Sequence, residues 1–99
     1  MSNDVGKKIR LMRESESVNR KQFSELTGIP YTSLVYYESD KNSPDVQVVM
    51  KMLNHPKFTK YTLWFMTGQI SPEAGQIAPA LAHSGQDETD YSASGKKTG

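Results

Sequence analysis

The chain has no cysteine and only two histidines among its 99 residues. Without thiolates it cannot form a disulfide, an iron–sulfur cluster or a zinc site with cysteine ligands, and we expect no metal. Its longest apolar run, Leu63 to Met66, is too short to span a bilayer. The first residues also lack the apolar stretch of a secretory signal. We therefore expect a soluble protein of a reducing compartment, with no membrane partner.

The sequence also lacks the motifs of common enzymes. It contains no glycine-rich phosphate loop, no Gly-x-Ser-x-Gly nucleophile elbow and no His-Glu-x-x-His zinc motif. Residues 94–97 fit the pattern Ser-x-x-Lys, but the surrounding segment lacks the Val, Ile, Leu, Met, Phe and Trp side chains that could hold a nucleophile in place. We expect no enzymatic activity, no cofactor and no small-molecule substrate.

Charge is distributed unevenly, although the net charge is only +1. Residues 1–60 carry ten Lys or Arg against seven Asp or Glu, whereas residues 69–99 carry two against four. This asymmetry is compatible with a basic binding surface in the first part of the chain. A random scatter of solvated charge explains it equally well, so charge alone does not identify a partner.

The composition divides the chain into three parts. Eight of the nine aromatic residues precede residue 70. Residues 84–99 contain no Val, Ile, Leu, Met, Phe or Trp, so burial cannot offset the entropy cost of ordering them. We expect a folded domain at residues 3–70, a C-terminal arm at residues 71–83 and a flexible tail at residues 84–99.

Five short helices are predicted within the domain, which makes the fold all-α. In the first, Val5, Ile9 and Met12 are spaced to form one apolar face, and Ser2 or Asn3 is the N-cap. No Asn-Gly or Asp-Gly hairpin signal interrupts the domain.

Capping residues and glycines mark the second and third helices. Asn19 and Gln22 form a capping-box pattern at the start of the second, and Gly28 ends it. The third begins near Pro30 and ends by Asp40.

The last two helices follow the same kinds of signal. Ser43 is the expected N-cap of the fourth, with Pro44 at its first position. Thr59 is expected to cap the fifth, which ends at Gly68. The expected buried face of the fourth helix consists of Val46, Val49, Met50 and Leu53.

The stretch from residue 20 to residue 38 is the most informative. It places the small residue Ser24 where two steeply crossing helices would approach each other, and Gly28 in the turn between them. The apolar residues that would join the two helices are Phe23, Ile29, Leu34 and Tyr37. Such a second helix fits the major groove of B-DNA with its free face. That face contains Tyr31, Thr32, Val35 and Tyr36.

This stretch resembles the helix-turn-helix of the Cro/CI (XRE) repressor superfamily, and the resemblance extends over about residues 5–68. Residues 38–44 resemble the family's Glu-x-Gly-x-Arg-x-Pro loop, with Asp40 and Asn42 in place of the glycine and the arginine. Residues 63–68 resemble the family's Trp-Leu-Leu-Thr-Gly ending. The resemblance implies a lambda-repressor-like DNA-binding domain, in which Lys41 would substitute for the missing loop arginine.

The whole chain resembles the immunity repressors of Peduovirus temperate phages. The length of 99 residues, residues 60–67, residues 75–83 and the Lys-Thr-Gly end carry this resemblance. It implies a transcriptional repressor that shuts an early lytic promoter and maintains lysogeny in the cytoplasm of a bacterial host. It also implies a homodimer and a double-stranded DNA operator built from direct repeats.

We expect DNA contacts from the free face of the third helix and from the cations around it. Arg20 would contact a phosphate, Thr32 and Tyr36 would contact bases, and Ser39 would either contact a phosphate or cap its helix. The expected DNA-binding residues are Arg20, Lys21, Tyr31, Thr32, Ser33, Val35, Tyr36, Ser39 and Lys41.

The fifth helix carries more large apolar side chains than a short helix can bury in a small domain. This excess predicts a two-fold contact between two copies of the chain. The expected dimer-interface residues are Phe58, Tyr61, Trp64 and Phe65.

Two other functions remain open at this point. An antitoxin would keep DNA binding and use residues 69–82 to bind a toxin protein. A protein-interaction module would keep the fold without binding DNA, and a salt-dependent shift of a duplex fragment would exclude it.

Overall fold

The computed structural model describes residues 5–82, and their regular structure is helical. The predicted all-α fold with five α-helices is confirmed, and the described residues contain no strand. The predicted N-cap at residue 2 or 3 and the predicted tail lie outside the described residues. The helices are α1 (Val5–Ser15), α2 (Arg20–Thr27), α3 (Tyr31–Glu38), α4 (Val46–Leu53) and α5 (Thr62–Thr67), with the 3-10 helices η1 (Thr59–Tyr61) and η2 (Pro72–Ala74).

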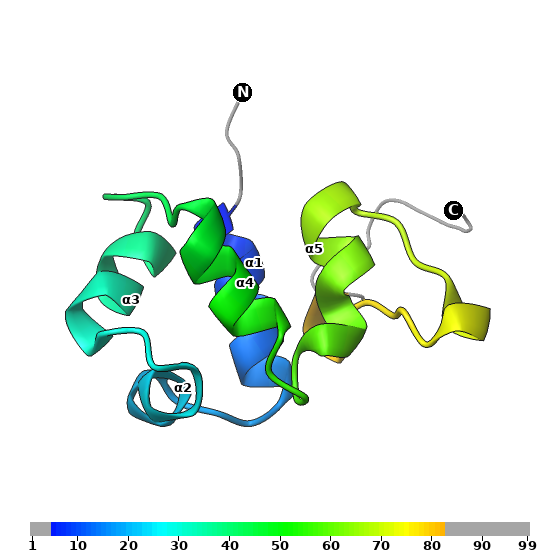
Figure 1. The fold of residues 1–99 in the computed structure, drawn as a ribbon, viewed down its shortest axis with the longest axis horizontal. Helices are drawn as coiled ribbons and strands as arrows, with labels where there is room; N and C mark the ends of the chain where they lie inside the picture. Colours follow the sequence, from blue (N-terminus) through cyan, green and yellow to red (C-terminus); the bar gives the residue numbers. More distant parts are fainter. Residues whose placement is uncertain (1–4, 83–99) are drawn as a thin grey trace.

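α1 and α4 run through the middle of the molecule, with α2 and α3 on one side and α5 on the other (Figure 1). Gly6 lets α1 pass close to the end of α3. A Cβ atom at this position would lie 2.4 Å from the backbone oxygen of Tyr37 and 2.9 Å from Oδ1 of Asp40. Since a larger residue would push the two helices apart, the placement of α3 against α1 depends on this glycine.

The start of α2 and the turn between α2 and α3 form as the sequence predicts. Oδ1 of Asn19 accepts from the N–H of Gln22 at 2.8 Å, and Oε1 of Gln22 accepts from the N–H of Asn19 at 2.9 Å, which completes the capping box. Gly28 ends α2 with a φ of 78°, where glycine is favoured. The hydroxyl of Ser24 donates to the carbonyl of Ile29 at 2.6 Å and ties α2 to the start of α3.

α4 begins later than predicted. Its N-cap is Asp45, whose carboxylate accepts from the N–H of Val48 at 2.9 Å. The prediction of Ser43 as N-cap was therefore wrong, and Pro44 precedes the helix. A carboxylate both accepts the orphan N–H bond and interacts favourably with the positive end of the helix dipole.

The buried face of α4 also differs from the prediction. Val46 and Met50 were expected in the core, but they are 67% and 54% exposed. Leu53 is buried as predicted and Val49 is half-buried, whereas Met52, which was not predicted to be buried, is 0% exposed. The contacts with the rest of the core, rather than the spacing of the apolar residues, decide which face of α4 is covered.

The fifth helix is preceded by η1. Thr59 was expected to cap α5, but it begins η1 and its hydroxyl donates to the carbonyl of Leu53, so this prediction was wrong. α5 begins at Thr62 and ends at Gly68, which has a φ of 80° and is the predicted terminating glycine.

Residues 69–82, which comprise the described part of the predicted arm and the two residues before it and are called the arm from here on, fold back along α5 and reach the end of α1. The N–H of Ile77 donates to the carbonyl of Lys60 at 2.9 Å, and the N–H of Leu81 donates to the hydroxyl of Ser15 at 3.1 Å. Pro79 is among the fully buried side chains. The arm therefore packs against the domain that contains α1 to α5.

Aromatic rings join the two halves of the core. Phe23 of α2 and Phe58, which directly precedes η1, are both 0% exposed. Their ring centroids lie 4.9 Å apart in an edge-to-face arrangement at 68°. Because the two residues are far apart in sequence, this contact holds the segment after α4 against the helix-turn-helix.

A polar contact joins the end of α1 to η1. The hydroxyl of Tyr61 donates to the carboxylate of Glu16, and Nζ of Lys60 lies 2.9 Å from the same carboxylate. Burial disfavours the charged form of Glu16, but the hydrogen bonds from Tyr61 and Lys60 outweigh it, so the pKa of Glu16 lies below its usual value. Burial and the hydrogen bond to Glu16 raise the pKa of Tyr61 well above its usual value.

Candidate nucleic-acid interface

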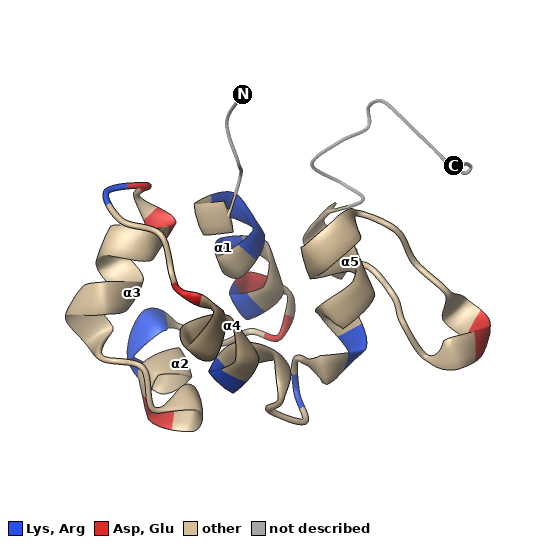
Figure 2. Cartoon of the chain, turned by 45° about the horizontal axis from the view of Figure 1, so that its top comes forward, with Lys and Arg blue, Asp and Glu red and all other residues tan. Residues whose placement is uncertain are grey.

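α3 forms one end of the molecule, and its ribbon is uncharged until its last residue (Figures 1 and 2). Leu34 and Tyr37 point into the core and are 0% and 8% exposed. On the opposite face, Tyr31 is 50% exposed, Tyr36 is 45% exposed, and Thr32 is exposed as well. The structure thus brings the three predicted aromatic and hydroxyl-bearing residues together on the outer surface of α3.

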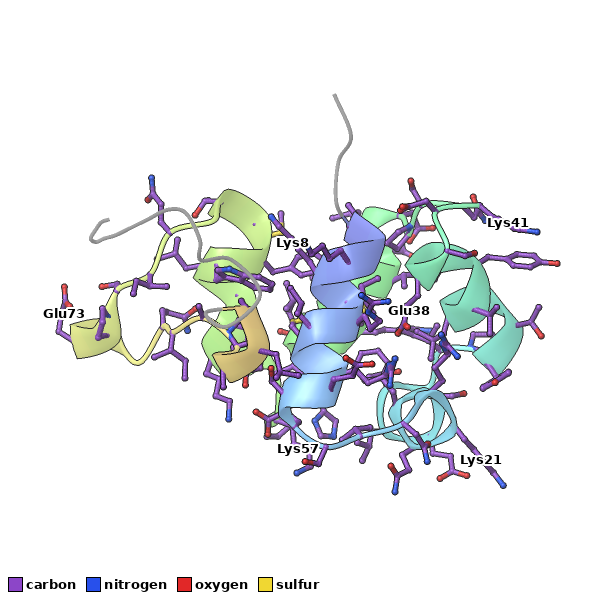
Figure 3. The ribbon with its side chains drawn as sticks, turned by 180° about the vertical axis from the view of Figure 1, so that it is seen from behind. Lys8, Lys21, Glu38, Lys41, Lys57 and Glu73 are labelled. Carbon is purple, nitrogen blue, oxygen red and sulfur yellow. The ribbon has the colours of Figure 1, made fainter. Side chains whose placement is uncertain are left out.

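Positive charges lie on either side of this helix. Lys21 at the start of α2 and Lys41 after α3 both extend into solvent at the α3 end of the molecule (Figure 3). The N–H of Lys41 donates to the carbonyl of Tyr36 at 2.9 Å and fixes the loop against the end of α3. Asp40 has a φ of 64°, a left-handed conformation that Asp adopts more readily than most residues. This is the position at which the Cro/CI loop has its glycine.

The remaining predicted residues of α3 are less accessible. Ser33 and Val35 are half-buried on its flanks. Ser39 is exposed, but its hydroxyl donates to the carbonyl of Tyr36 at 3.2 Å. This geometry corresponds to the capping alternative for Ser39, and a phosphate would have to replace that bond.

A buried carboxylate lies behind the interface, and its role was not predicted from the sequence. Glu38, the last residue of α3, has a side chain only 2% exposed. Nε and Nη2 of Arg13 donate to its two oxygens at 2.8 and 2.9 Å. Nε of Arg20 donates to Oε1 of the same carboxylate at 3.1 Å. The three side chains come from α1, α2 and α3, and they join these helices.

Arg13 is completely engaged by this arrangement. Its side chain is 8% exposed, and Nη1 donates to the carbonyl of Val18 at 3.0 Å. The hydrogen bond to Glu38 outweighs the effect of burial, so the pKa of Arg13 is raised. No local pattern in the sequence could reveal this contact, because its residues lie on three different helices.

The four predicted dimer residues lie inside the chain. Phe58, Tyr61, Trp64 and Phe65 are 0%, 3%, 7% and 6% exposed, and Ala82 of the arm belongs to the same buried cluster. They have little surface left for a second protomer, and the expectation that they form the contact needs correction. Lys8 of α1 lies over the rings of Trp64 and Phe65, and Gln76 of the arm accepts from the N–H of Leu63, so both α1 and the arm pack against α5.

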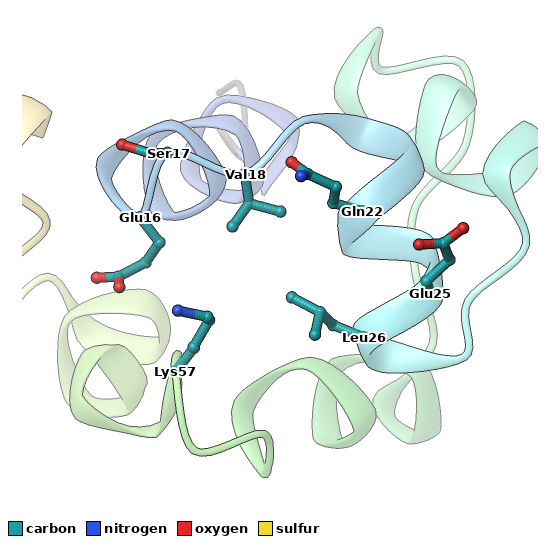
Figure 4. A pocket seen from close by; sticks show the side chains of 7 residues that line it. All are labelled: Glu16, Ser17, Val18, Gln22, Glu25, Leu26 and Lys57. Atoms are coloured by element: carbon teal, nitrogen blue, oxygen red, sulfur yellow. The ribbon is translucent and has the colours of Figure 1, made fainter.

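Figure 4 shows the concave feature between the α1–α2 turn, α2 and the loop after α4. It has a volume of about 350 Å³, and none of the predicted DNA-binding residues lines it. The lining residues are Glu16, Ser17, Val18, Gln22, Glu25, Leu26 and Lys57.

Within residues 5–82, no group of three or more His, Asp or Glu side chains could hold a metal ion. In the same residues, no helix has both the length and the apolar character needed to cross a bilayer.

Comparison with known proteins agrees with this geometry. The helix-turn-helix family model matches residues 9–59, which include all of α2, α3 and α4. Repressor protein C of Escherichia phage P2 is 60% identical over 99 residues, and the alignment covers 100% of both chains. These matches confirm the resemblance to the Cro/CI superfamily and to the Peduovirus repressors. The chain belongs to the helix-turn-helix family and is a full-length homologue of a phage repressor.

Proposed function

We propose that this protein is a sequence-specific DNA-binding repressor that shuts an early lytic promoter of a temperate phage and maintains lysogeny in the bacterial host cytoplasm. The outer face of α3 carries this proposal, because it presents exposed Tyr and Thr side chains between Lys21 and Lys41. The similarity to Repressor protein C supports it. Repression follows when the bound protein occupies a site that overlaps the promoter and excludes RNA polymerase.

α3 reads the operator from the major groove, which is about 12 Å wide and admits an α-helix. Thr32 in its first turn and Tyr36 in its second contact base edges, where a Thr methyl group and a Tyr ring pack against thymine methyl groups. Arg20, Lys21 and Lys41 contact phosphates and fix the position of α3 on the duplex. Shape and hydrogen bonds suffice for this recognition, so no cofactor takes part.

Thr32→Ala and Tyr36→Ala are each expected to weaken operator binding by about 1–3 kcal/mol, about 5- to 150-fold. Both side chains are exposed, so the variants should keep the fold and the affinity for unrelated DNA. Fluorescence anisotropy with the promoter fragment located by footprinting measures the affinity.

Asn54→Ala, which removes an exposed polar side chain at the C-terminal end of α4, outside α3 and outside the surface proposed below for dimerisation, is the matched control and should bind operator like the wild type. Wild-type affinity in both α3 variants would show that α3 is not the reader. No salt-dependent shift of any duplex by the wild-type protein would favour a protein-interaction module instead.

We also propose that the protein binds its operator as a homodimer. One recognition helix covers too few base pairs to select a single site in a genome. α5 and the arm lie at the end of the molecule opposite α3 (Figure 1). Met66 of α5 and Ile70 and Ile77 of the arm are 59%, 47% and 39% exposed. These three apolar side chains, which we call the α5–arm surface, are available to a second copy of the chain.

Such a dimer constrains the spacing of the half-sites. Both α3 helices must meet the same face of the duplex, so their centres lie one helical turn apart, about 34–36 Å, or a multiple of this distance. The long axis of the protomer is 36 Å, and α3 and the α5–arm surface lie at its two ends. Contact through the α5–arm surface therefore favours a multiple of the turn. Direct repeats additionally require one α3 to meet its half-site reversed, which a small side chain such as Thr32 tolerates.

Ile70→Glu is expected to convert the dimer to a monomer, because a charge in an apolar contact between protomers cannot be solvated. Sedimentation velocity measures the change. Val46→Glu, at a 67% exposed position of α4, is the control and should remain dimeric. A dimeric Ile70→Glu variant with wild-type circular dichroism would place the interface elsewhere.

A further inference from the structure

We propose that Glu38 is a positioning residue for DNA binding: its buried carboxylate anchors Arg20 through Nε, so that the two outer nitrogens of this guanidinium are presented to a DNA phosphate. The proposal rests on the DNA-binding function proposed above. It assigns a functional role to a side chain that is 2% exposed and cannot itself contact DNA.

The geometry of Arg20 fits a contact in which one edge is anchored and the other is available. Its hydrogen bond within residues 5–82 runs from Nε to Oε1 of Glu38 at 3.1 Å, and its side chain is 40% exposed. Because the guanidinium is planar, a bond at Nε restricts the plane in which Nη1 and Nη2 lie. Two nitrogens in a fixed plane can bind two oxygens of one phosphate.

The charge of the cluster also favours an external anion. Two arginines and one carboxylate leave a net charge of +1. Arg13 is 8% exposed and uses Nε and Nη2 on Glu38 and Nη1 on a backbone carbonyl. The nearby Glu14 lies 3.7 Å from Arg13 but is 47% exposed, so water screens its effect. Arg13 therefore neutralises Glu38 from the inside, and the surplus positive charge is located on Arg20 at the surface.

The place of Arg20 in the fold is consistent with a phosphate ligand. It is the first residue of α2, directly after the N-cap Asn19, and Lys21 follows it. The first N–H groups of a helix favour a nearby anion. Glu38, in turn, is the last residue of α3, so the same carboxylate links the phosphate contact to the helix that reads the bases.

The test uses the full chain, a duplex of unrelated sequence and a series of salt concentrations. The double variant Arg13→Met/Glu38→Leu removes the carboxylate and one arginine, so the net charge and the long-range attraction to DNA do not change. The logarithm of the binding constant falls linearly with the logarithm of the salt concentration, with a slope of about −0.9 for each phosphate contact. One contact is therefore worth about eightfold in affinity at 0.1 M salt relative to 1 M. We expect the affinity of the double variant at 0.1 M salt to fall about three- to eightfold. The magnitude of the slope of log K against log[salt] should fall by up to about 0.9, which corresponds to one phosphate contact.

The same double replacement in an Arg20→Ala chain should cause no further loss, because the anchored group is already absent. This comparison separates positioning from a general distortion of the fold, which would weaken binding equally in both backgrounds. Lys21→Ala is the matched control: Lys21 is the neighbouring cation and has no carboxylate partner within residues 5–82, so its effect should be the same with and without the double replacement.

Arg20→Lys tests the proposal without disturbing the buried pair of Arg13 and Glu38. A lysine keeps the charge but lacks the separate inner and outer nitrogens, so we expect most of the affinity lost in Arg20→Ala to be lost here too. Full wild-type affinity in Arg20→Lys would overturn the proposal, as would equal losses from the double replacement with and without Arg20. If the wild-type chain binds no duplex at all, the proposed function fails rather than the role of Glu38.

Discussion

Glu38→Leu is expected to lower the free energy of unfolding by about 3–5 kcal/mol, because it leaves the charge of Arg13 buried without its carboxylate. Arg13 has only 8% of its side chain exposed and donates two hydrogen bonds to Glu38. Domains of this size have a total stability of about 5–15 kcal/mol, so the loss is a large part of it. Urea unfolding followed by circular dichroism at neutral pH measures the change.

Two variants make this result specific to the buried pair. Glu14→Leu removes another carboxylate beside Arg13, but one that is 47% exposed and 3.7 Å away, and it should cost at most about 1 kcal/mol. The double variant Arg13→Met/Glu38→Leu replaces both charges with apolar groups and should recover most of the lost stability. Equal losses from Glu14→Leu and Glu38→Leu would show that the buried ion pair does not determine the effect.

Phe58→Ala is expected to destabilise the protein by about 3–5 kcal/mol, independently of protein concentration. The ring is 0% exposed and packs edge to face against Phe23, so its removal leaves a cavity between the helix-turn-helix and η1. A dimer-interface residue would behave differently, because its loss would alter the dissociation constant of the dimer. Thermal unfolding at several protein concentrations distinguishes the two roles.

The control is Met66→Ala, which shortens a side chain that is 59% exposed on the α5–arm surface. It should leave the stability of the protomer nearly unchanged. A loss of less than about 1 kcal/mol in Phe58→Ala, together with weaker dimerisation, would restore Phe58 to the interface and contradict its place in the core.

Features that depend on neighbouring residues could be predicted from the sequence. The capping box of Asn19 and Gln22 and the terminating Gly28 each involve residues within a few positions, and the structure has them as expected. The predicted start of α4 was wrong because two good capping residues, Ser43 and Asp45, lie two positions apart. Only the geometry of the loop selects the second.

Features that depend on the tertiary fold could not be predicted. Arg13, Arg20 and Glu38 meet only when three helices have packed, and their spacing in the sequence carries no signal. The arm is rich in Ala and Pro and has few large side chains, a composition typical of linkers. Pro79 and Ala82 are nevertheless buried, and Gln76 accepts from the N–H of Leu63 in α5.

The bond between the N–H of Leu81 and the hydroxyl of Ser15 joins residues that are 66 positions apart. During synthesis α1 to α4 leave the ribosome before the arm, so the helix-turn-helix emerges before Pro79 and Ala82 can pack into the core. Closing so long a loop is slow compared with forming the local turns. A nascent chain therefore completes its core only after the arm has emerged. A truncated chain that ends before residue 82 would lack part of this core, and we expect cellular proteases to degrade it before it can act as a repressor.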